Sequence, residues 1–282
     1  MAETSAAGLV FADIARMLVH APRPLVYGLS GAQGSGKSTI ARAVVARLRA
    51  DGLKAAALSI DDLYYGREDR RRIAARTHPL FITRGPPGAH DVDRGMAILD
   101  TLKSLRTVRL PRFSKALDEP LPMAEWEEAS GDLDLLLFEG WCLGAQPQDA
   151  ADLDRPINVL EEVFDANGHW RRAVNANLAG PYQRLFARID RLAYLKPPTF
   201  DVVRRWRWEA EQAAAAADPG RAGPGLLDED AVDFFVQHHE RITRRMMEDL
   251  PPRAALTIEL DERRGVVSAA AHQATPRPDS TS

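Results

Sequence analysis

The strongest constraint on the fold is a glycine-rich stretch near the start of the chain. The sequence GAQGSGKS at 31–38 follows an apolar run at 25–29 and leads into apolar residues at helical spacing up to residue 50. A strand, a glycine turn and a helix in this order are typical of a phosphate-binding loop. Glycines let the backbone N–H groups of the turn converge on a phosphate at the positive end of the helix dipole. The residues that we expect to bind a nucleoside triphosphate are Gly31, Ala32, Gln33, Gly34, Ser35, Gly36, Lys37, Ser38 and Thr39.

Two side chains of this loop carry specific chemistry. Lys37 is expected to reach the β- and γ-phosphates as a point charge, and the Ser38 hydroxyl is expected to bind Mg²⁺. We therefore expect ATP and Mg²⁺ as cofactors and a catalytic role for Lys37. A chance glycine turn at a helix start would explain neither the Lys-Ser pair nor the preceding strand.

Composition narrows the class of protein. The 282 residues are 45% hydrophobic, which suffices for a large α/β core. A net charge of −3 gives no overall field for nucleic acid or an anionic membrane, so we expect neither as a partner. The single cysteine excludes an intramolecular disulfide, and no apolar run approaches the ~20 residues of a membrane span. We expect a cytoplasmic protein that acts on a small molecule, and the sequence does not predict its oligomeric state.

Strands alternate with helices along the chain. Short apolar runs at 54–60, 133–138, 191–195 and 255–260 are separated by helical patterns. This order predicts an α/β fold with a mostly parallel sheet and helices on both faces. The expected organisation is an N-terminal helix and linker at 1–23, a kinase domain at 24–267 with a substrate loop at 84–91 and a possible lid at 200–225, and a disordered tail at 268–282. Between the strands, 111–122 is expected to be a polar loop and 174–189 a helix.

Acidic residues follow two of the strands, where catalytic groups of such sheets are found. Glu139 ends the LDLLLF strand and is a candidate to hold the metal ion. Asp61 and Asp62 follow the strand at 54–60, and one of them is expected to cap a helix instead. From its position we favour Asp61 as the base that accepts a proton from the acceptor hydroxyl, close enough to contribute to the metal site.

Several polar residues of irregular segments could bind a small acidic acceptor. The simpler alternative for each loop arginine is a solvated surface role. The candidates for acceptor binding are Tyr64, Arg84, His90, Asp91, Arg112 and Lys115, and the candidates for a lid cation are Arg204 and Arg207. The neighbouring Trp206 and Trp208 are expected to pack in the core. The pair His238-His239 lacks a third ligand at suitable spacing, so we expect no zinc site.

The motifs together resemble one family of kinases. They are GAQGSGKST, SIDDLYY, THPLFITRGPPGAHD, LPRFSKALDE, LLLFEGW and the block that starts at INVLEEVFDANGHW. Over about residues 25–260 they are similar to the D-glycerate 3-kinase family, in the group of P-loop kinases that includes phosphoribulokinase, uridine kinase and pantothenate kinase. The resemblance implies a three-layer P-loop nucleoside-kinase fold and transfer of the ATP γ-phosphate to the 3-hydroxyl of D-glycerate. In related kinases the aspartate of the S-x-D stretch is the base, which here is Asp61.

One stretch departs from the family pattern. After LPRF the family has an aspartate or asparagine before the lysine and an arginine a few residues later, whereas this chain has Ser114 and then Glu119-Pro120. A kinase for another hydroxylated metabolite, of nucleoside or pantothenate type, therefore stays open. A nucleotide-switch ATPase is disfavoured because the chain has neither an NKxD nor an LSGGQ-type signature. Retention of Lys37, Ser38, Asp61 and Glu139 disfavours a catalytically silent binding protein.

Overall fold

The fold is built on one six-stranded sheet. In the computed structural model, which describes residues 4–217 and 227–272, the strand order is β10-β9-β8-β1-β7-β2. The pairs β2·β7, β7·β1, β1·β8 and β8·β9 are parallel, and β10 pairs antiparallel with β9. The strands are β1 (Leu25–Gly31), β2 (Ala55–Ser59), β7 (Leu135–Gly140), β8 (Arg191–Lys196), β9 (Leu256–Leu260) and β10 (Val266–Ala271). The expected α/β fold with a mostly parallel sheet is confirmed.

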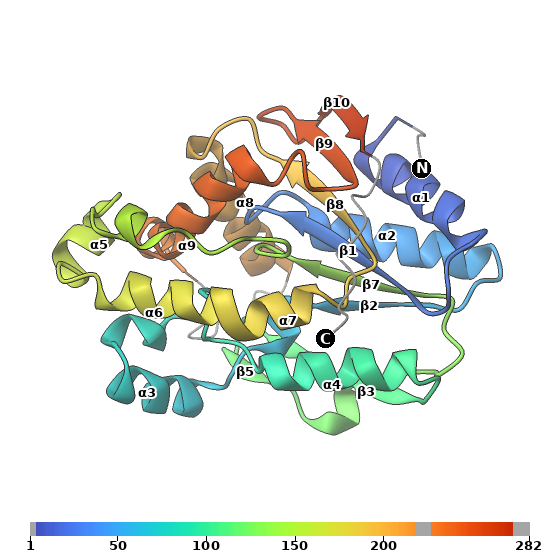
Figure 1. Ribbon diagram of the computed structural model, residues 1–282, viewed down its shortest axis with the longest axis horizontal. Helices are drawn as coiled ribbons and strands as arrows, with labels where there is room; N and C mark the ends of the chain where they lie inside the picture. The colour runs from blue at the N-terminus through green and yellow to red at the C-terminus, as the bar shows by residue number, and fades with distance from the viewer. Residues whose placement is uncertain (1–3, 218–226, 273–282) are drawn as a thin grey trace.

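Helices cover both faces of this sheet (Figure 1). They are α1 (Ala6–Leu18), α2 (Lys37–Ala50), α3 (Arg67–Arg76), α4 (Val92–Lys103), α5 (Val159–Phe164), α6 (His169–Asn177), α7 (Gln183–Phe186), α8 (Asp201–Ala217) and α9 (Glu229–Asp249). Apolar residues of α1, α2 and α8 pack on one face of the sheet, and those of α4, α6, α7 and α9 pack on the other.

The side chains of the central strand β1 contribute to the apolar clusters on both faces of the sheet. Leu25, Tyr27 and Leu29 belong to the cluster with α1 and α2, whereas Val26 belongs to the cluster with α4. Successive side chains of a strand point to opposite faces, so a strand buried on both faces is apolar throughout. All seven residues of β1 are buried, so the phosphate loop follows a strand that is buried along its whole length.

Segment 111–122 differs from the expected polar loop. It contains a small antiparallel hairpin of β4 (Phe113–Ser114) and β5 (Glu119–Pro120), next to a second short sheet of β3 (Val108–Leu110) and β6 (Glu127–Ala129). Side-chain contacts fix this hairpin: the Phe113 N–H donates to Asp62, and the Glu119 carboxylate accepts from Arg67. Such contacts between distant segments leave no periodic signal in the sequence.

Helix boundaries also differ in one region. The helix expected at 174–189 begins earlier, at His169, and passes through a π-helical turn at Leu178–Tyr182 that contains Pro181. Helix α5 was not expected. Because Pro cannot donate a backbone hydrogen bond, the wider turn accommodates it without ending the helix.

The C-terminal expectation needs a correction. The tail was expected to be disordered from residue 268, but Ser268–Ala271 lie in β10 and bond to β9. The side chains there are exposed, so backbone pairing rather than apolar burial holds the strand. Of the possible lid at 200–225, Phe200 is buried and residues 201–217 form α8, whereas 218–225 lie outside the described residues, as do 273–282.

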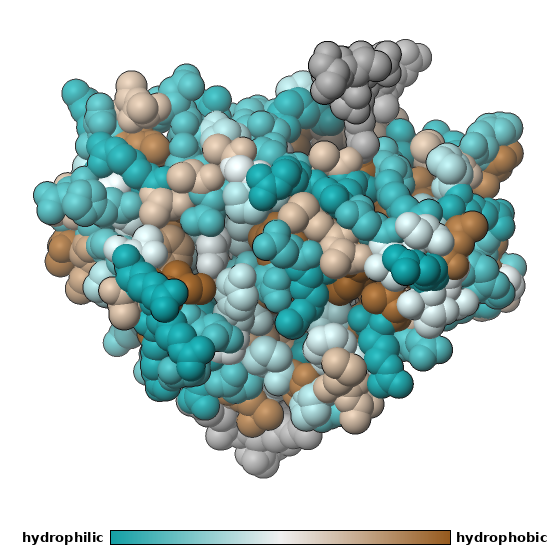
Figure 2. All heavy atoms as spheres, turned by 60° about the horizontal axis from the view of Figure 1, so that its bottom comes forward, coloured by the Kyte–Doolittle hydropathy of each residue, from teal (hydrophilic) through white to brown (hydrophobic). Residues whose placement is uncertain are grey.

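The face that carries the lower elements of Figure 1 is largely hydrophilic. Figure 2 shows small, separate hydrophobic spots among hydrophilic side chains on this face. Scattered apolar residues of this kind are normal on protein surfaces. In the parts of the chain that the structure describes, every helix is too short or too polar to cross a bilayer.

Candidate active site

The phosphate loop lies between β1 and α2 as expected. Gly34 and Gly36 have positive φ angles of 73° and 89°, and Gly36 precedes the first residue of α2. A Cβ atom on Gly34 would lie 2.5 Å from the Trp206 carbonyl group, so α8 packs directly on the loop. The Lys37 ammonium is buried and lies 3.4 Å from the Ala32 carbonyl oxygen. The loop therefore combines the backbone shape and the cation that a triphosphate requires.

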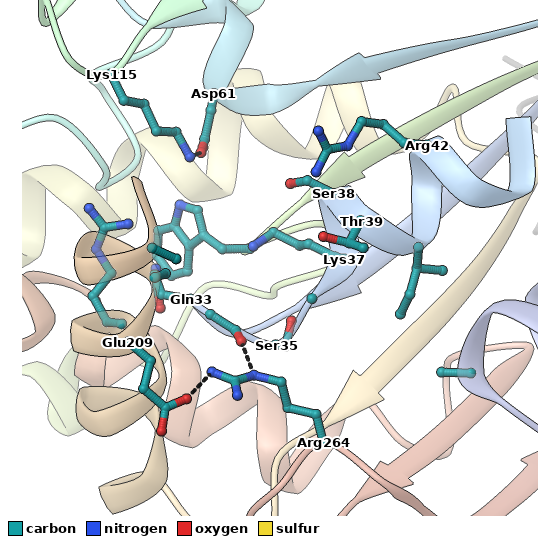
Figure 3. Close-up of a pocket in the computed structure, with 18 of the residues that line it drawn as sticks. Gln33, Ser35, Lys37, Ser38, Thr39, Arg42, Asp61, Lys115, Glu209 and Arg264 are labelled. Atoms are coloured by element: carbon teal, nitrogen blue, oxygen red, sulfur yellow. Dashed lines mark hydrogen bonds and ion pairs between the residues drawn. The ribbon is translucent and has the colours of Figure 1, made fainter. Parts of the chain in front are cut away.

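A cavity of about 970 Å³ opens from this loop. One end is lined by the phosphate loop and the start of α2. The other end, which we name the acceptor end, is lined by Asp61, Tyr64, Arg84, Lys115, Trp141, Arg207, Phe235 and His239. Figure 3 shows Lys37 and the Asp61–Lys115 pair extending into the cavity from different elements. This volume is in the range of small-molecule sites.

Asp61 lies in this cavity, and its neighbour does not. The Asp61 carboxylate is 2.6 Å from the Lys115 ammonium, and its negative charge adds to burial in raising the pKa of the nearby Tyr64. Burial alone would raise the pKa of Asp61, but Lys115 and Lys37 outweigh it and hold the pKa well below its ordinary value. Asp61 is therefore ionised and able to accept a hydrogen bond from an acceptor hydroxyl.

Asp62 has the structural role that one of the two acids was expected to have. It forms a capping box with Ser59 at the start of the short helix Ile60–Leu63 and also accepts from the Phe113 N–H. These bonds turn its carboxylate away from the phosphate loop and toward the hairpin of β4 and β5.

Ser38 and Glu139 meet beside the loop. The Ser38 hydroxyl donates to the Glu139 carboxylate at 2.6 Å, although the two residues are 101 positions apart. The register of β1 and β7 causes this, because Glu139 pairs with Leu29, just before the loop. The other carboxylate oxygen of Glu139 is buried without a hydrogen-bond partner. Hydroxyl and carboxylate oxygens are ligands that suit Mg²⁺.

Cations gather around Asp61. Arg84 and Arg207 line the acceptor end together with Lys115, and the Arg207 guanidinium lies 4.9 Å from the centre of the Phe235 ring. Burial, with a smaller contribution from Arg84, lowers the pKa of Arg207 to about 10. Each of the three cations is paired with a carboxylate, Arg84 with Asp118, Lys115 with Asp61 and Arg207 with Glu211.

The structure places three predicted site residues elsewhere. Asp91 is the N-cap of α4, where its carboxylate accepts from the Arg94 N–H at 3.0 Å. Arg112 bonds to Asp62 and Glu127 and lines an adjoining groove instead of the cavity. Arg204 is half-exposed and pairs with Asp233 and Glu229 of α9. Hydrogen bonds or ion pairs with these partners hold each of the three side chains outside the cavity wall.

His90 lies outside the cavity wall and packs against Tyr64, which lines the cavity. Its ring stacks on Tyr64 with 4.3 Å between centroids, and its Nδ1 is 2.5 Å from the Tyr182 hydroxyl. The same hydroxyl accepts from the Gly88 N–H at 3.0 Å, which holds the Tyr182 side chain against His90. Burial lowers the pKa of His90 to about 4, which keeps the ring neutral. His90 therefore positions Tyr64 through packing.

Sequence reasoning missed several residues of the cavity wall, of which four have side chains that matter for the site. Trp141, Phe235, His239 and Arg264 all line the cavity. Trp141 stands two residues after Glu139, and its place at a strand end was a usable signal. The other three come from α9 and from the β9–β10 turn. The His239 ring fills the space that a side chain at Gly85 would need, a contact that only the folded chain reveals.

Comparison with known proteins identifies the family. Residues 26–153 match the phosphoribulokinase/uridine kinase family. The chain is 31% identical over 227 residues to the uncharacterized kinase mug58 of Schizosaccharomyces pombe, covering 77% of this chain and 79% of that protein. It is 29% identical over 263 residues to the chloroplastic D-glycerate 3-kinase of Arabidopsis thaliana, covering 87% of this chain and 54% of that protein. The chain thus spans about half the length of the plant enzyme.

A solved structure shows the same fold. The D-glycerate 3-kinase from Cryptococcus neoformans has a TM-score of 0.73 and 24% sequence identity, with 94% of this chain and 97% of that chain covered. Its likeness agrees with the parallel sheet and phosphate loop described above. The chain belongs to the phosphoribulokinase/uridine kinase family and is a P-loop kinase that acts on a small molecule.

Proposed function

We propose that this kinase transfers the γ-phosphate of ATP to the 3-hydroxyl of D-glycerate in the presence of Mg²⁺. The observation that carries the proposal is the acceptor end, where Arg84, Lys115 and Arg207 line the cavity together with Asp61, and where Lys115 lies 2.6 Å from the Asp61 carboxylate. Three cations beside one base suit an acceptor that has both an anionic group and a hydroxyl. The similarity to D-glycerate 3-kinases supports the same acceptor.

The residues have distinct tasks in this proposal. The loop amides and Lys37 bind the phosphates and stabilise the charge of the transferring group. Ser38 and Glu139 would hold Mg²⁺, with Asp61 close to it, and the ion would neutralise charge on the β- and γ-phosphates. Asp61 orients the acceptor hydroxyl and accepts its proton as the new O–P bond forms and the bond to ADP breaks. Arg84 binds the acceptor carboxylate, while Lys115 and Arg207 balance the charge near the γ-phosphate.

Ser114, the departure from the family pattern, lies outside the acceptor end. Its hydroxyl accepts from the Leu117 N–H at 3.2 Å and so caps the turn between β4 and β5. Ser114 does not line the cavity, so its side chain makes no direct contact with an acceptor there. The departure from the family pattern at this position therefore does not argue against D-glycerate.

An ADP-release assay tests the proposal. The acceptors are D-glycerate, L-glycerate, uridine, pantothenate, ribulose 5-phosphate and none, each with ATP in the presence or absence of Mg²⁺. We expect stimulation by D-glycerate above all others and loss of activity when Mg²⁺ is chelated. Stimulation by another acceptor alone would refute the acceptor assignment, and undiminished activity without divalent metal would refute the role of Mg²⁺.

A further inference from the structure

One carboxylate outside the predicted site joins two buried arginines. Asp118 lies in the turn between β4 and β5, with a positive φ of 57°. One carboxylate oxygen accepts from Arg84 at 2.7 Å, and the other accepts from Arg70 of α3 at 2.5 Å. The side chains of Arg70 and Arg84 are only 2% and 7% exposed. This triad connects α3, the loop at 84–91 and the hairpin.

We propose that Asp118 is the positioning residue of the acceptor end. It holds the Arg84 guanidinium toward the cavity and, through the hairpin, places Lys115 opposite Asp61. The consequence for the acceptor rests on the function proposed above, whereas the positioning itself does not.

The hydrogen bonds of the turn explain how one residue places two cations. Arg84 also donates to the Lys115 carbonyl at 3.4 Å, so the guanidinium contacts both ends of the turn. The Lys115 side chain then extends to Asp61 at 2.6 Å. A guanidinium held by a carboxylate loses the rotational freedom of a long side chain before the acceptor arrives.

Arg70 determines the net charge of the cluster that it forms with Asp118 and Arg84 next to the acceptor end. If Asp118 paired with Arg84 alone, the pair would be neutral. Because Arg70 shares the same carboxylate, the three side chains carry one positive charge between them. Arg70 does not line the cavity, and it donates to the Ile82 carbonyl at 3.2 Å. The triad therefore favours an anionic group at the acceptor end without a direct contact from Arg70.

The adjacent residue offers a matched control. Glu119 lies in the same hairpin and also bonds to α3, accepting from the Arg67 guanidinium at 3.0 Å. Its side chain is 39% exposed and bonds to Arg67, both to the backbone N–H and to the guanidinium. Glu119→Gln thus weakens the contact of the hairpin with α3 and leaves the bond to Arg84 in place.

Steady-state kinetics compare Asp118→Asn with Glu119→Gln. Asparagine has nearly the same volume and tolerates positive φ, so the variant should fold. We expect the KM for D-glycerate to rise about tenfold to a hundredfold in Asp118→Asn, as for loss of a hydrogen bond to a charged group. The KM for ATP should stay within about threefold, and Glu119→Gln should resemble the wild type in both constants. Asp118→Gly, which also suits the turn, should reproduce the selective effect.

Equal changes in the KM for ATP and for D-glycerate would show a general structural role and overturn the proposal. A rise in acceptor KM of the same size in Glu119→Gln would do so too. A crystal structure of Asp118→Asn supplies the second measurement, in which we expect the Arg84 guanidinium to move by about the length of a hydrogen bond, ~3 Å, or more. An unmoved Arg84 would also refute the positioning role. If the wild type does not use D-glycerate, the proposed function fails, and this crystal structure still decides the role of Asp118.

Discussion

The two ends of the cavity are constructed differently. The phosphate end is built around one continuous segment, 31–39, whose shape depends on backbone conformation and two positive-φ glycines and which α8 and Arg264 support from outside. The acceptor end is assembled from side chains of separate segments, which contribute Asp61, Arg84, Lys115, Arg207 and His239. A backbone cradle recognises phosphate, which all nucleotides share. Side chains on separate segments can change one at a time, so acceptor choice can vary while nucleotide binding is retained.

The largest effect should follow from Asp61→Asn. This change removes the proton acceptor and leaves the phosphate end intact, so we expect kcat to fall by about 10²–10⁴-fold while the KM for ATP changes little. ADP-release kinetics provide both constants. Asp62→Asn is the control, with a lower melting temperature because the capping box is weakened and with kcat largely retained. The opposite ranking of the two variants would assign the base to Asp62.

Arg207 and Arg204 form a second matched pair, one helical turn apart on α8. Arg207 lines the cavity, so Arg207→Gln should lower kcat/KM for the acceptor by about 10²-fold, the usual cost of removing a group that stabilises transition-state charge. Arg204→Gln breaks an exposed ion pair and should cost roughly 0–1 kcal/mol of stability with unchanged kinetics. Kinetics and thermal melts of both variants check this. A kinetic defect in Arg204→Gln would indicate that Arg204, and not Arg207 alone, acts on the bound substrates.

A smaller effect concerns pH. Lys115 and Lys37 hold the pKa of Asp61 below its ordinary value against the effect of burial, so Asp61 stays ionised until the pH falls below that range. The wild-type kcat/KM should show no acid limb from Asp61 down to about pH 5. In Lys115→Met the effect of burial is less opposed, the pKa rises, and an acid limb should move up into the measured range. Lys54→Met, at a surface ion pair with Asp132, is the control. Identical pH profiles of wild type and Lys115→Met would contradict this coupling.

The smallest effect tests the phosphate end by itself. Alanine at Gly34 or Gly36 costs about 1–2 kcal/mol for positive φ. Only Gly34→Ala adds a clash, because its Cβ would lie 2.5 Å from the Trp206 carbonyl group, whereas nothing lies within 4 Å at Gly36. We expect the melting temperature of Gly34→Ala to fall further than that of Gly36→Ala by a few degrees, about 2–4 °C per kcal/mol. Equal melting temperatures would mean that α8 can move away from the new Cβ atom without a loss of stability.

This difference between the two ends also explains what the sequence could predict. The phosphate loop, Glu139 after its strand and Asp61 after the neighbouring strand follow from local motifs and from the rule that parallel strands end at one edge. The parallel sheet followed from the alternation of strands and helices. The family resemblance, carried by specific motifs such as FEGW, is confirmed by the comparisons.

Long-range side-chain contacts could not be predicted. Arg84 and Arg112 look alike in sequence, as arginines of irregular segments, but Arg84 lines the cavity while Arg112 pairs with Asp62 and Glu127. Which of the two arginines lines the cavity depends on the acidic residues that lie next to each in the folded chain. Asp118 gave no signal either, because its importance lies in the contact of its carboxylate with both Arg70 and Arg84. The residues of the β9–β10 turn likewise reach the cavity only through sheet pairing.

That turn has a consequence for synthesis on the ribosome. Figure 3 shows the Arg264 side chain extending to the phosphate loop, where its guanidinium donates to the Gly34 carbonyl at 2.6 Å, across 230 positions of the chain. The same guanidinium lies 5.1 Å from the centre of the Trp206 ring. Strand β1 is likewise flanked by β7 and β8, which are translated much later. The nucleotide-binding loop is therefore translated long before the turn that supports it, 230 positions later. We expect nucleotide to stabilise the newly made protein fully only after the β9–β10 turn has left the exit tunnel.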